Sequence, residues 1–243
     1  MQQQQKPLPQ TEDWQNRLAE RMASKEWKDN NPVLESLTQE EIICFFLNQR
    51  REDRQRLFRY RTIRVLIGIV CCIVGFSLPE QPKFLKYLGS FLQSSCLVIM
   101  LSDGGLLGAR FLPLSTRLSR IESLLPRYLV GCHDPALLPK LLRERPQLSK
   151  NLQKASDNTM AHILIAMGGD EAFALPFELR AELATLAEKH ETSLDLSIVI
   201  LLALTSARDG NVQPVLRRLS NDARSLRLRE VAAECLREFS TSP

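Results

Sequence analysis

Few residues of this 243-residue chain combine the type and the spacing that chemistry requires. Cys132 and His133 are adjacent, and each side chain can bind zinc, but a zinc site needs three or four ligands and no second pair stands at a usable spacing. His162 falls within an apolar helical pattern, and His190 falls near an expected helix C-terminus, where a histidine interacts well with the helix dipole. We therefore predict no metal site and no cofactor.

Catalytic motifs are equally sparse. Asp170 and Glu171 are adjacent carboxylates, which rarely converge on one substrate and which stabilise a helix start by themselves. Gly104, Gly105 and Gly108 resemble a fragment of a phosphate-binding loop but lack its lysine and its preceding strand, so close helix packing explains them better. The chain has no nucleophile elbow and no dinucleotide fingerprint. We predict no catalytic residue and a protein that is not an enzyme.

The six cysteines form no Cys-x-x-Cys pair, and three of them lie in apolar runs. This usage predicts free thiols in a reducing compartment rather than a disulfide framework. No apolar core closely follows the N-terminal glutamines, so we expect no cleavable signal peptide.

Arginines gather just before the most apolar part of the chain. Between Arg50 and Arg64 there are seven arginines and two acidic residues. The favoured interpretation is charge that orients a membrane span and attracts anionic lipid. A solvated helix face comes second, and nucleic-acid binding with Phe58 and Tyr60 as stacking groups comes last, so we expect no nucleic-acid partner. A second basic group, diluted by acidic neighbours, is assigned to solvated surface: Arg217, Arg218, Arg224, Arg227 and Arg229.

The hydrophobic pattern predicts an all-α protein, because no sustained alternation of period two occurs. We divide the chain into a disordered tail over residues 1–10, an N-terminal helical region over 11–62, a hydrophobic helical hairpin over 63–109 and a helical-repeat domain over 115–243. Thr38 and Glu41 have the spacing of a capping box at a helix start. The helices expected in the last domain span 116–129, 135–143, 147–155, 159–167, 178–190, 195–207, 212–219 and 226–239.

Two apolar segments predict a transmembrane hairpin. Residues 65–78 carry no charge, and residues 87–109 carry only Asp103. The first segment is short, about 21 Å of helix against roughly 30 Å of hydrocarbon, although neighbouring arginines could extend it by snorkelling. Since arginines flank the pair and two lysines occupy the turn, the positive-inside rule places the N- and C-termini in the cytoplasm. The alternative is a hairpin buried in a helical bundle.

The C-terminal part contains a faint internal repeat. An offset of 38 residues sets Ile163 on Leu201 and Pro176 on Pro214, and residues 228–236 read Leu-Arg-x-x-Ala-Ala-x-x-Leu. Over residues 157–239 this pattern resembles the HEAT-repeat family, whose period is about 40 residues. The resemblance implies a small α-solenoid that binds other proteins and has no catalytic residues.

The leading functional hypothesis is a non-catalytic scaffold or adaptor, anchored in a membrane by residues 63–109, whose HEAT-like surface binds a protein partner. One alternative is a soluble helical-repeat protein with a buried hairpin, which would remain in solution without detergent. Another is a HEAT-type lyase or accessory protein. It would need a reactive, exposed thiol at Cys132 or Cys235, and blocking thiols would abolish its activity.

Overall fold

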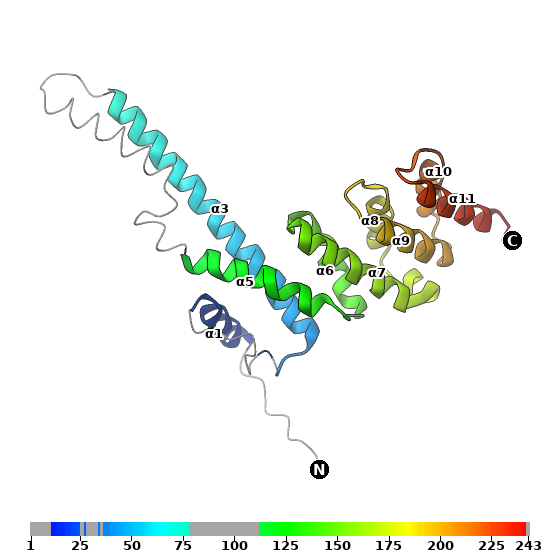
Figure 1. Cartoon of the computed structure of the whole chain (residues 1–243), viewed down its shortest axis with the longest axis horizontal. Coiled ribbons are helices and arrows are strands. Elements are labelled where there is room, and N and C mark those ends of the chain that lie inside the picture. The colour runs from blue at the N-terminus through cyan, green and yellow to red at the C-terminus, as the bar shows by residue number, and fades with distance from the viewer. Residues whose placement is uncertain (1–10, 25–26, 28–33, 35, 78–111, 242–243) are drawn as a thin grey trace, which may run out of the picture. The chain divides into compact units, whose positions relative to one another are not determined.

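A computed structural model of the chain describes residues 11–24, 27, 34, 36–77 and 112–241. Every regular element in these residues is a helix, so the prediction of an all-α protein is confirmed (Figure 1). The expected tail over residues 1–10 lies outside the described residues. The α-helices are α1 (Thr11–Ala23), α3 (Gln39–Ser77), α5 (Leu112–Leu129), α6 (Leu138–Glu144), α7 (Lys150–Phe173), α8 (Phe177–Glu188), α9 (Leu194–Ser206), α10 (Val212–Asp222) and α11 (Leu226–Thr241).

The chain divides into two compact units. The first unit comprises Met1–Ser36 and Phe45–Glu122, and the second comprises Leu37–Cys44 and Ser123–Pro243. In the first unit, the largest fully buried side chains include Leu18 and Met22 of α1 and Phe46 of α3. A helix start in the second unit is fixed by the predicted capping box: the Thr38 amide donates to Glu41 Oε2 at 2.8 Å, and the Glu41 amide donates to Thr38 Oγ1 at 3.3 Å.

A buried ion pair joins three segments of the first unit. Asp53 of α3 is fully buried, and Arg117 of α5 donates to both of its carboxylate oxygens, from Nε at 2.6 Å and from Nη2 at 2.5 Å. Arg117 also donates from Nη1 to the Ala19 carbonyl oxygen of α1 at 3.2 Å. Because a buried charge is tolerated only with such partners, this single carboxylate specifies how α3 meets α5.

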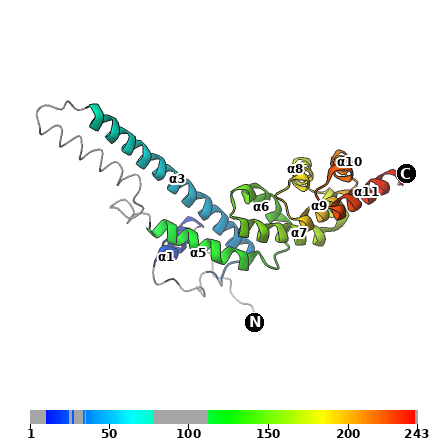
Figure 2. The ribbon, with the colours of Figure 1, turned by 45° about the horizontal axis from the view of Figure 1, so that its top comes forward.

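The helices of the second unit pack in two rows. The helix α9 packs against both α7 and α11. The helix α8 contacts α10, and in addition α8 packs on α9 and α10 packs on α11. Figure 2 shows α6, α8 and α10 along one side and α7, α9 and α11 along the other. Two short 3₁₀ turns, Pro135–Leu137 and Arg145–Gln147, flank α6. Asp134 caps the first of them by accepting from the Ala136 amide at 2.9 Å, as an Asp-Pro helix start requires.

The helix α7 differs from the sequence-based expectation. We expected helices over 147–155 and 159–167, but α7 continues through residues 156–158. The expected end at residue 167 is followed by a bend at Gly168, whose φ of 69° and ψ of −178° are not helical. Two polar residues of this stretch are buried: Asp157 bonds to other elements, and the Thr159 hydroxyl donates to the Ala155 carbonyl oxygen at 2.9 Å. Hydrogen bonds to these buried polar groups therefore let the helix continue where the sequence pattern predicted a break.

The bend at Gly168 yields a testable expectation. Its backbone lies in a region that only glycine adopts without strain, so Gly168→Ala is expected to lower the free energy of unfolding by about 1–3 kcal/mol. Gly210 is the matched control, since it lacks a positive φ and an added Cβ there meets nothing within 4 Å. Urea unfolding of the two variants measures the difference. Equal effects at the two positions would contradict the assignment of strain.

The prediction of a membrane hairpin is wrong. Among the described residues, no helix combines the length and the apolarity needed to cross a membrane. The first apolar segment is the end of α3, a 39-residue helix that also carries the arginines, and its uncharged part runs from Val65 to Ser77, about 20 Å at 1.5 Å per residue. The placement of both termini in the cytoplasm rested on the hairpin and is withdrawn with it. The whole second arm, residues 87–109, and the turn before it lie outside the described residues.

Candidate functional site

A surface pocket of about 400 Å³ opens between α6 and α8 in the second unit. Its apolar lining includes the buried side chains of Leu142 and Leu186. Its charged lining includes the exposed Arg143, Glu182 and Lys189. Pro146, Ala181 and Thr185 complete the surface around the buried Arg145. An apolar interior with a few charged groups at its edge is typical of a site that holds one partner side chain in a fixed orientation.

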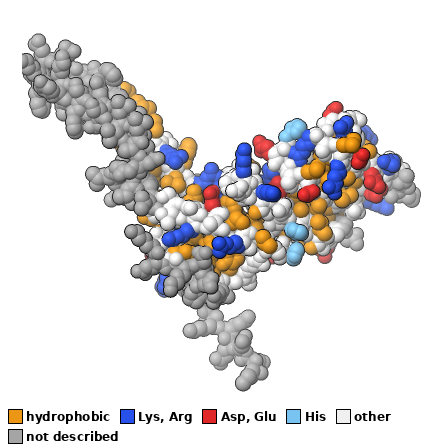
Figure 3. Space-filling model, viewed as in Figure 1, with side chains coloured by type: hydrophobic (Ala, Val, Ile, Leu, Met, Phe, Trp, Pro, Cys, Tyr) orange, Lys and Arg blue, Asp and Glu red, His pale blue; other side chains and the backbone are white. Residues whose placement is uncertain are grey.

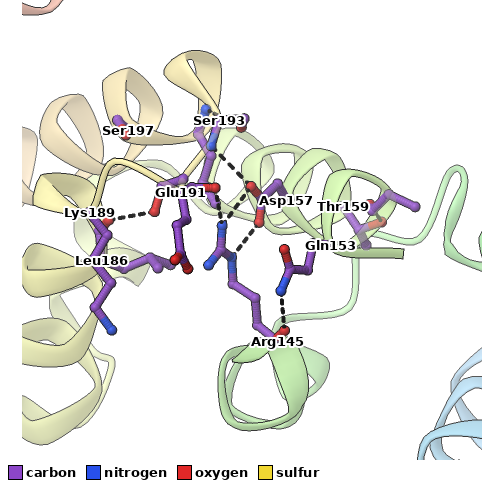
Figure 4. Close-up of polar contacts among 12 residues, drawn as sticks. Arg145, Gln153, Asp157, Thr159, Leu186, Lys189, Glu191, Ser193 and Ser197 are labelled. Carbon is purple, nitrogen blue, oxygen red and sulfur yellow. Dashed lines mark hydrogen bonds and ion pairs between the residues drawn. The ribbon is translucent and has the colours of Figure 1, made fainter. Parts of the chain in front are cut away.

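One wall of the pocket is fixed by a buried ion pair. Arg145 donates from Nε to Asp157 Oδ1 at 2.7 Å and from Nη2 to Asp157 Oδ2 at 3.1 Å, and both side chains are almost completely buried. Arg145 Nη2 also donates to the Glu191 carbonyl oxygen at 3.0 Å, and Asp157 Oδ2 accepts from the Ser193 amide at 3.1 Å. Figure 4 shows these groups converging, with the Lys189 side chain running away from them. The network joins the 3₁₀ turn that follows α6, the helix α7 and the connection from α8 to α9.

The connection from α8 to α9 is also bonded to the segment that precedes α11. Arg224, which precedes α11, donates to the carbonyl oxygens of Lys189, His190 and Thr192, the first at 3.2 Å. The Thr192 hydroxyl donates to the Leu186 carbonyl oxygen at 2.7 Å. The backbone that presents Lys189 to the pocket is therefore bonded to neighbouring segments on both sides.

The pocket carries a net positive charge. Asp157 neutralises Arg145, whereas Arg143 and Lys189 have no ion-pair partner in the part of the chain that the structure describes. Glu182 is the single acidic side chain of the lining. Two cations against one anion, beside apolar surface, suit a ligand that carries a carboxylate next to an apolar group.

A second cluster of reactive groups lies where the start of α3 meets α6, also in the second unit. Lys140 Nζ donates to Cys44 Sγ at 2.9 Å and lies 3.6 Å from Glu40 Oε1. The hydrogen bond to Cys44 raises the pKa of Lys140 above its usual value. A hydrogen bond to Asp134 raises the pKa of Glu40 above its usual value, while the hydrogen bond from the Ala136 amide lowers the pKa of Asp134.

The cysteines singled out in the repeat domain are not exposed. Cys132 and Cys235 are 5% and 1% exposed, and burial raises the pKa of each thiol. A buried thiol with a raised pKa is a poor nucleophile, because the thiolate is the reactive form. The described cysteine with a cation beside it is instead Cys44, which is half-buried.

The structure brings two of the three histidines together. The rings of His133 and His162 meet edge to face with centroids 6.1 Å apart, and both side chains are exposed. His190 and Glu171 are also exposed. Across the described ranges, no three His, Cys, Asp or Glu side chains are grouped to hold a metal ion. Gly104, Gly105 and Gly108 lie outside the described residues.

The arginine cluster before the apolar part of α3 is heterogeneous. Arg50 is 3% exposed and lies 3.3 Å from Glu122, so it belongs to the packing of the first unit. Arg56 forms a surface pair with Glu52 at 3.8 Å. In the second basic group, Arg218 lies 2.6 Å from Glu188, and Arg217, Arg227 and Arg229 are exposed. Figure 3 shows Lys and Arg side chains interleaved with acidic ones over the C-terminal helices.

Neither of the two sites was found from the sequence. Arg143 and Lys189 are 46 residues apart, and Cys44 and Lys140 are 96 residues apart. No motif connects the members of either pair, so only the packing of α6 reveals them.

Compared with models of known protein families, with curated proteins and with solved structures, the chain matches none.

Proposed function

We propose that the chain is a non-catalytic protein-binding module whose α6–α8 pocket holds an acidic segment of a partner protein. The observation that carries this proposal is the pair of exposed cations, Arg143 and Lys189, at the edge of an apolar pocket. The partner segment has an aliphatic or aromatic side chain for the apolar interior and an Asp or Glu beside it for the cations. A guanidinium can bind such a carboxylate through two parallel hydrogen bonds.

The arrangement of helices supports a repeat architecture of the kind that binds proteins. The offset of 38 residues in the sequence superimposes α7 and α8 on α9 and α10, and these helices occupy equivalent places in the two rows. Stacked helix pairs of this kind present a continuous surface to a partner. The resemblance to HEAT repeats is part of the proposal.

An exposed apolar surface on α3 also favours an interaction role. Phe58, Leu66, Val70 and Ile73 are each more than half exposed. Figure 3 shows orange apolar side chains gathered along this end of α3. Apolar patches of this kind on a folded chain usually mark a surface that contacts another molecule.

A peptide selection tests the proposal. The full chain is presented to a display library of random peptides, and the selection is repeated with the double variant Arg143→Glu/Lys189→Glu. We expect the wild-type chain to enrich peptides that carry Asp or Glu next to an apolar residue. The charge-reversed variant should bind them at least about tenfold more weakly, because it repels the carboxylate.

The control variant is Lys154→Glu/Arg217→Glu, which makes the same change of charge at two exposed residues outside the pocket lining. It should bind the enriched peptides as the wild-type chain does. If both double variants lose binding equally, net charge rather than the pocket attracts the peptides. If no acidic motif is enriched, the proposed partner chemistry is wrong.

A further inference from the structure

A second site with chemistry of its own lies at Cys44 and Lys140, and it is independent of the pocket. Lys140 Nζ is 2.9 Å from Cys44 Sγ, which is already the distance of a hydrogen bond. Cys44 is half-buried, and the Lys140 side chain is 50% exposed, so a small solute can reach both. We propose that Cys44 and Lys140 form a site of oxidative modification, at which a hydroperoxide oxidises the sulfur and the Lys140 amine then closes a covalent S–N bond.

The geometry supplies what this reaction needs. Glu40 lies one helical turn before Cys44, and its Oε1 is 3.6 Å from Lys140 Nζ, so the amine lies between a carboxyl and the sulfur. The remaining described thiols are unsuited to the reaction, since Cys132 and Cys235 are buried.

The first step is a two-electron oxidation of sulfur. Cys44 Sγ attacks one oxygen of the hydroperoxide, the O–O bond breaks, and the products are the sulfenic acid and water or an alcohol. The sulfur is oxidised and the peroxide is reduced, each by two electrons. The oxidised sulfur then stands beside the Lys140 amine, whose Nζ lies 2.9 Å from Sγ in the reduced chain.

The second step condenses the two side chains. The Lys140 ammonium releases a proton to water, and its nitrogen lone pair attacks the sulfur. The S–N bond forms, the S–O bond breaks, and the leaving hydroxide takes the second proton from nitrogen and departs as water. The net reaction converts a thiol, an amine and a hydroperoxide into a sulfenamide, water and the reduced peroxide. A thiol reductant reverses the cross-link by attacking its sulfur.

Mass spectrometry of the full chain tests the site. The protein is treated with hydrogen peroxide and digested with trypsin without reductant. We expect a linked pair of peptides that contain Cys44 and Lys140, lighter by two hydrogen atoms than their sum, with no cleavage at Lys140. Dithiothreitol should separate them. Cys44→Ser should abolish the link.

The decisive variant is Lys140→Arg, which keeps a positive charge beside the sulfur but has no primary amine. It should lose the link and accumulate Cys44 sulfenic acid, which dimedone labels about tenfold more strongly than in the wild-type chain. Lys154→Arg, at an exposed lysine of α7, should behave as wild type. Circular dichroism confirms that each variant is folded. Equal dimedone labelling of Cys44 in the wild-type chain and in Lys140→Arg, without a linked peptide, overturns the proposal, as does oxidation of Cys132 or Cys235 before Cys44.

Discussion

Asp157→Ala is expected to lower the free energy of unfolding of the second unit by about 3–5 kcal/mol. The Asp157 carboxylate accepts two hydrogen bonds from Arg145 and one from the Ser193 amide, and both side chains of the ion pair are buried. Removing it leaves a buried guanidinium without its counter-ion, which costs far more than the loss of one surface pair. Urea unfolding followed by circular dichroism measures the loss, and hydrogen exchange locates it in α6, α7 and α9.

Asp195→Ala is the matched control. Asp195 is an exposed carboxylate in the first turn of α9, where it interacts favourably with the helix dipole, so its removal should cost about 0.3–1 kcal/mol. Similar losses for Asp157→Ala and Asp195→Ala would show that the Arg145 ion pair does not hold the second unit together. The affinity of the pocket for acidic peptides should also fall in Asp157→Ala, because Arg145 forms part of the pocket lining.

The first unit contains the second large effect. Asp53→Ala should lower its free energy of unfolding by about 3–5 kcal/mol, because Arg117 would keep only its bond to the Ala19 carbonyl oxygen. The neighbouring Glu52 provides the control. It is exposed and pairs with Arg56 at 3.8 Å, so Glu52→Ala should cost at most about 0.5 kcal/mol.

Hydrogen exchange separates the two units in this experiment. Asp53→Ala should accelerate exchange in α1, α3 and α5 and leave α8 to α11 unchanged, since the bonds of Asp53 lie within the first unit. Uniform acceleration along the chain would contradict the division into two units. If Asp53→Ala lowered the free energy of unfolding as little as Glu52→Ala does, the structural role of the Asp53–Arg117 pair would be contradicted.

The C-terminal helices were predictable because local signals agree with their packing. The expected helices over 178–190, 195–207, 212–219 and 226–239 correspond to α8, α9, α10 and α11, with ends that differ by at most three residues. Ser193, for example, caps α9 by accepting from the Leu196 amide at 3.3 Å. The boundaries of short amphipathic helices can be predicted from the sequence when capping residues and Gly or Pro lie at their ends.

The errors arose where long-range partners decide the structure. The break expected between residues 155 and 159 did not form, and Asp157 within it bonds to Arg145, a partner that sequence spacing cannot identify. The apolar residues after Arg64 read as one arm of a membrane hairpin, but they end a helix that, like every other helix in the described residues, lacks the length and apolarity to cross a membrane. Both sites were missed for the same reason: Arg143 and Lys140 lie on α6, while their counterparts Lys189 and Cys44 come from distant segments.

A charge swap between the pocket and its peptide tests the central claim most directly. The affinity of an enriched acidic peptide, and of the same peptide with Lys in place of its acidic residue, is measured for the wild-type chain and for Arg143→Glu/Lys189→Glu. We expect the acidic peptide to bind only the wild-type chain and the lysine peptide to regain affinity for the variant, with both interactions weakened by salt. If the lysine peptide gains no affinity for the variant, the α6–α8 pocket does not bind the acidic residue.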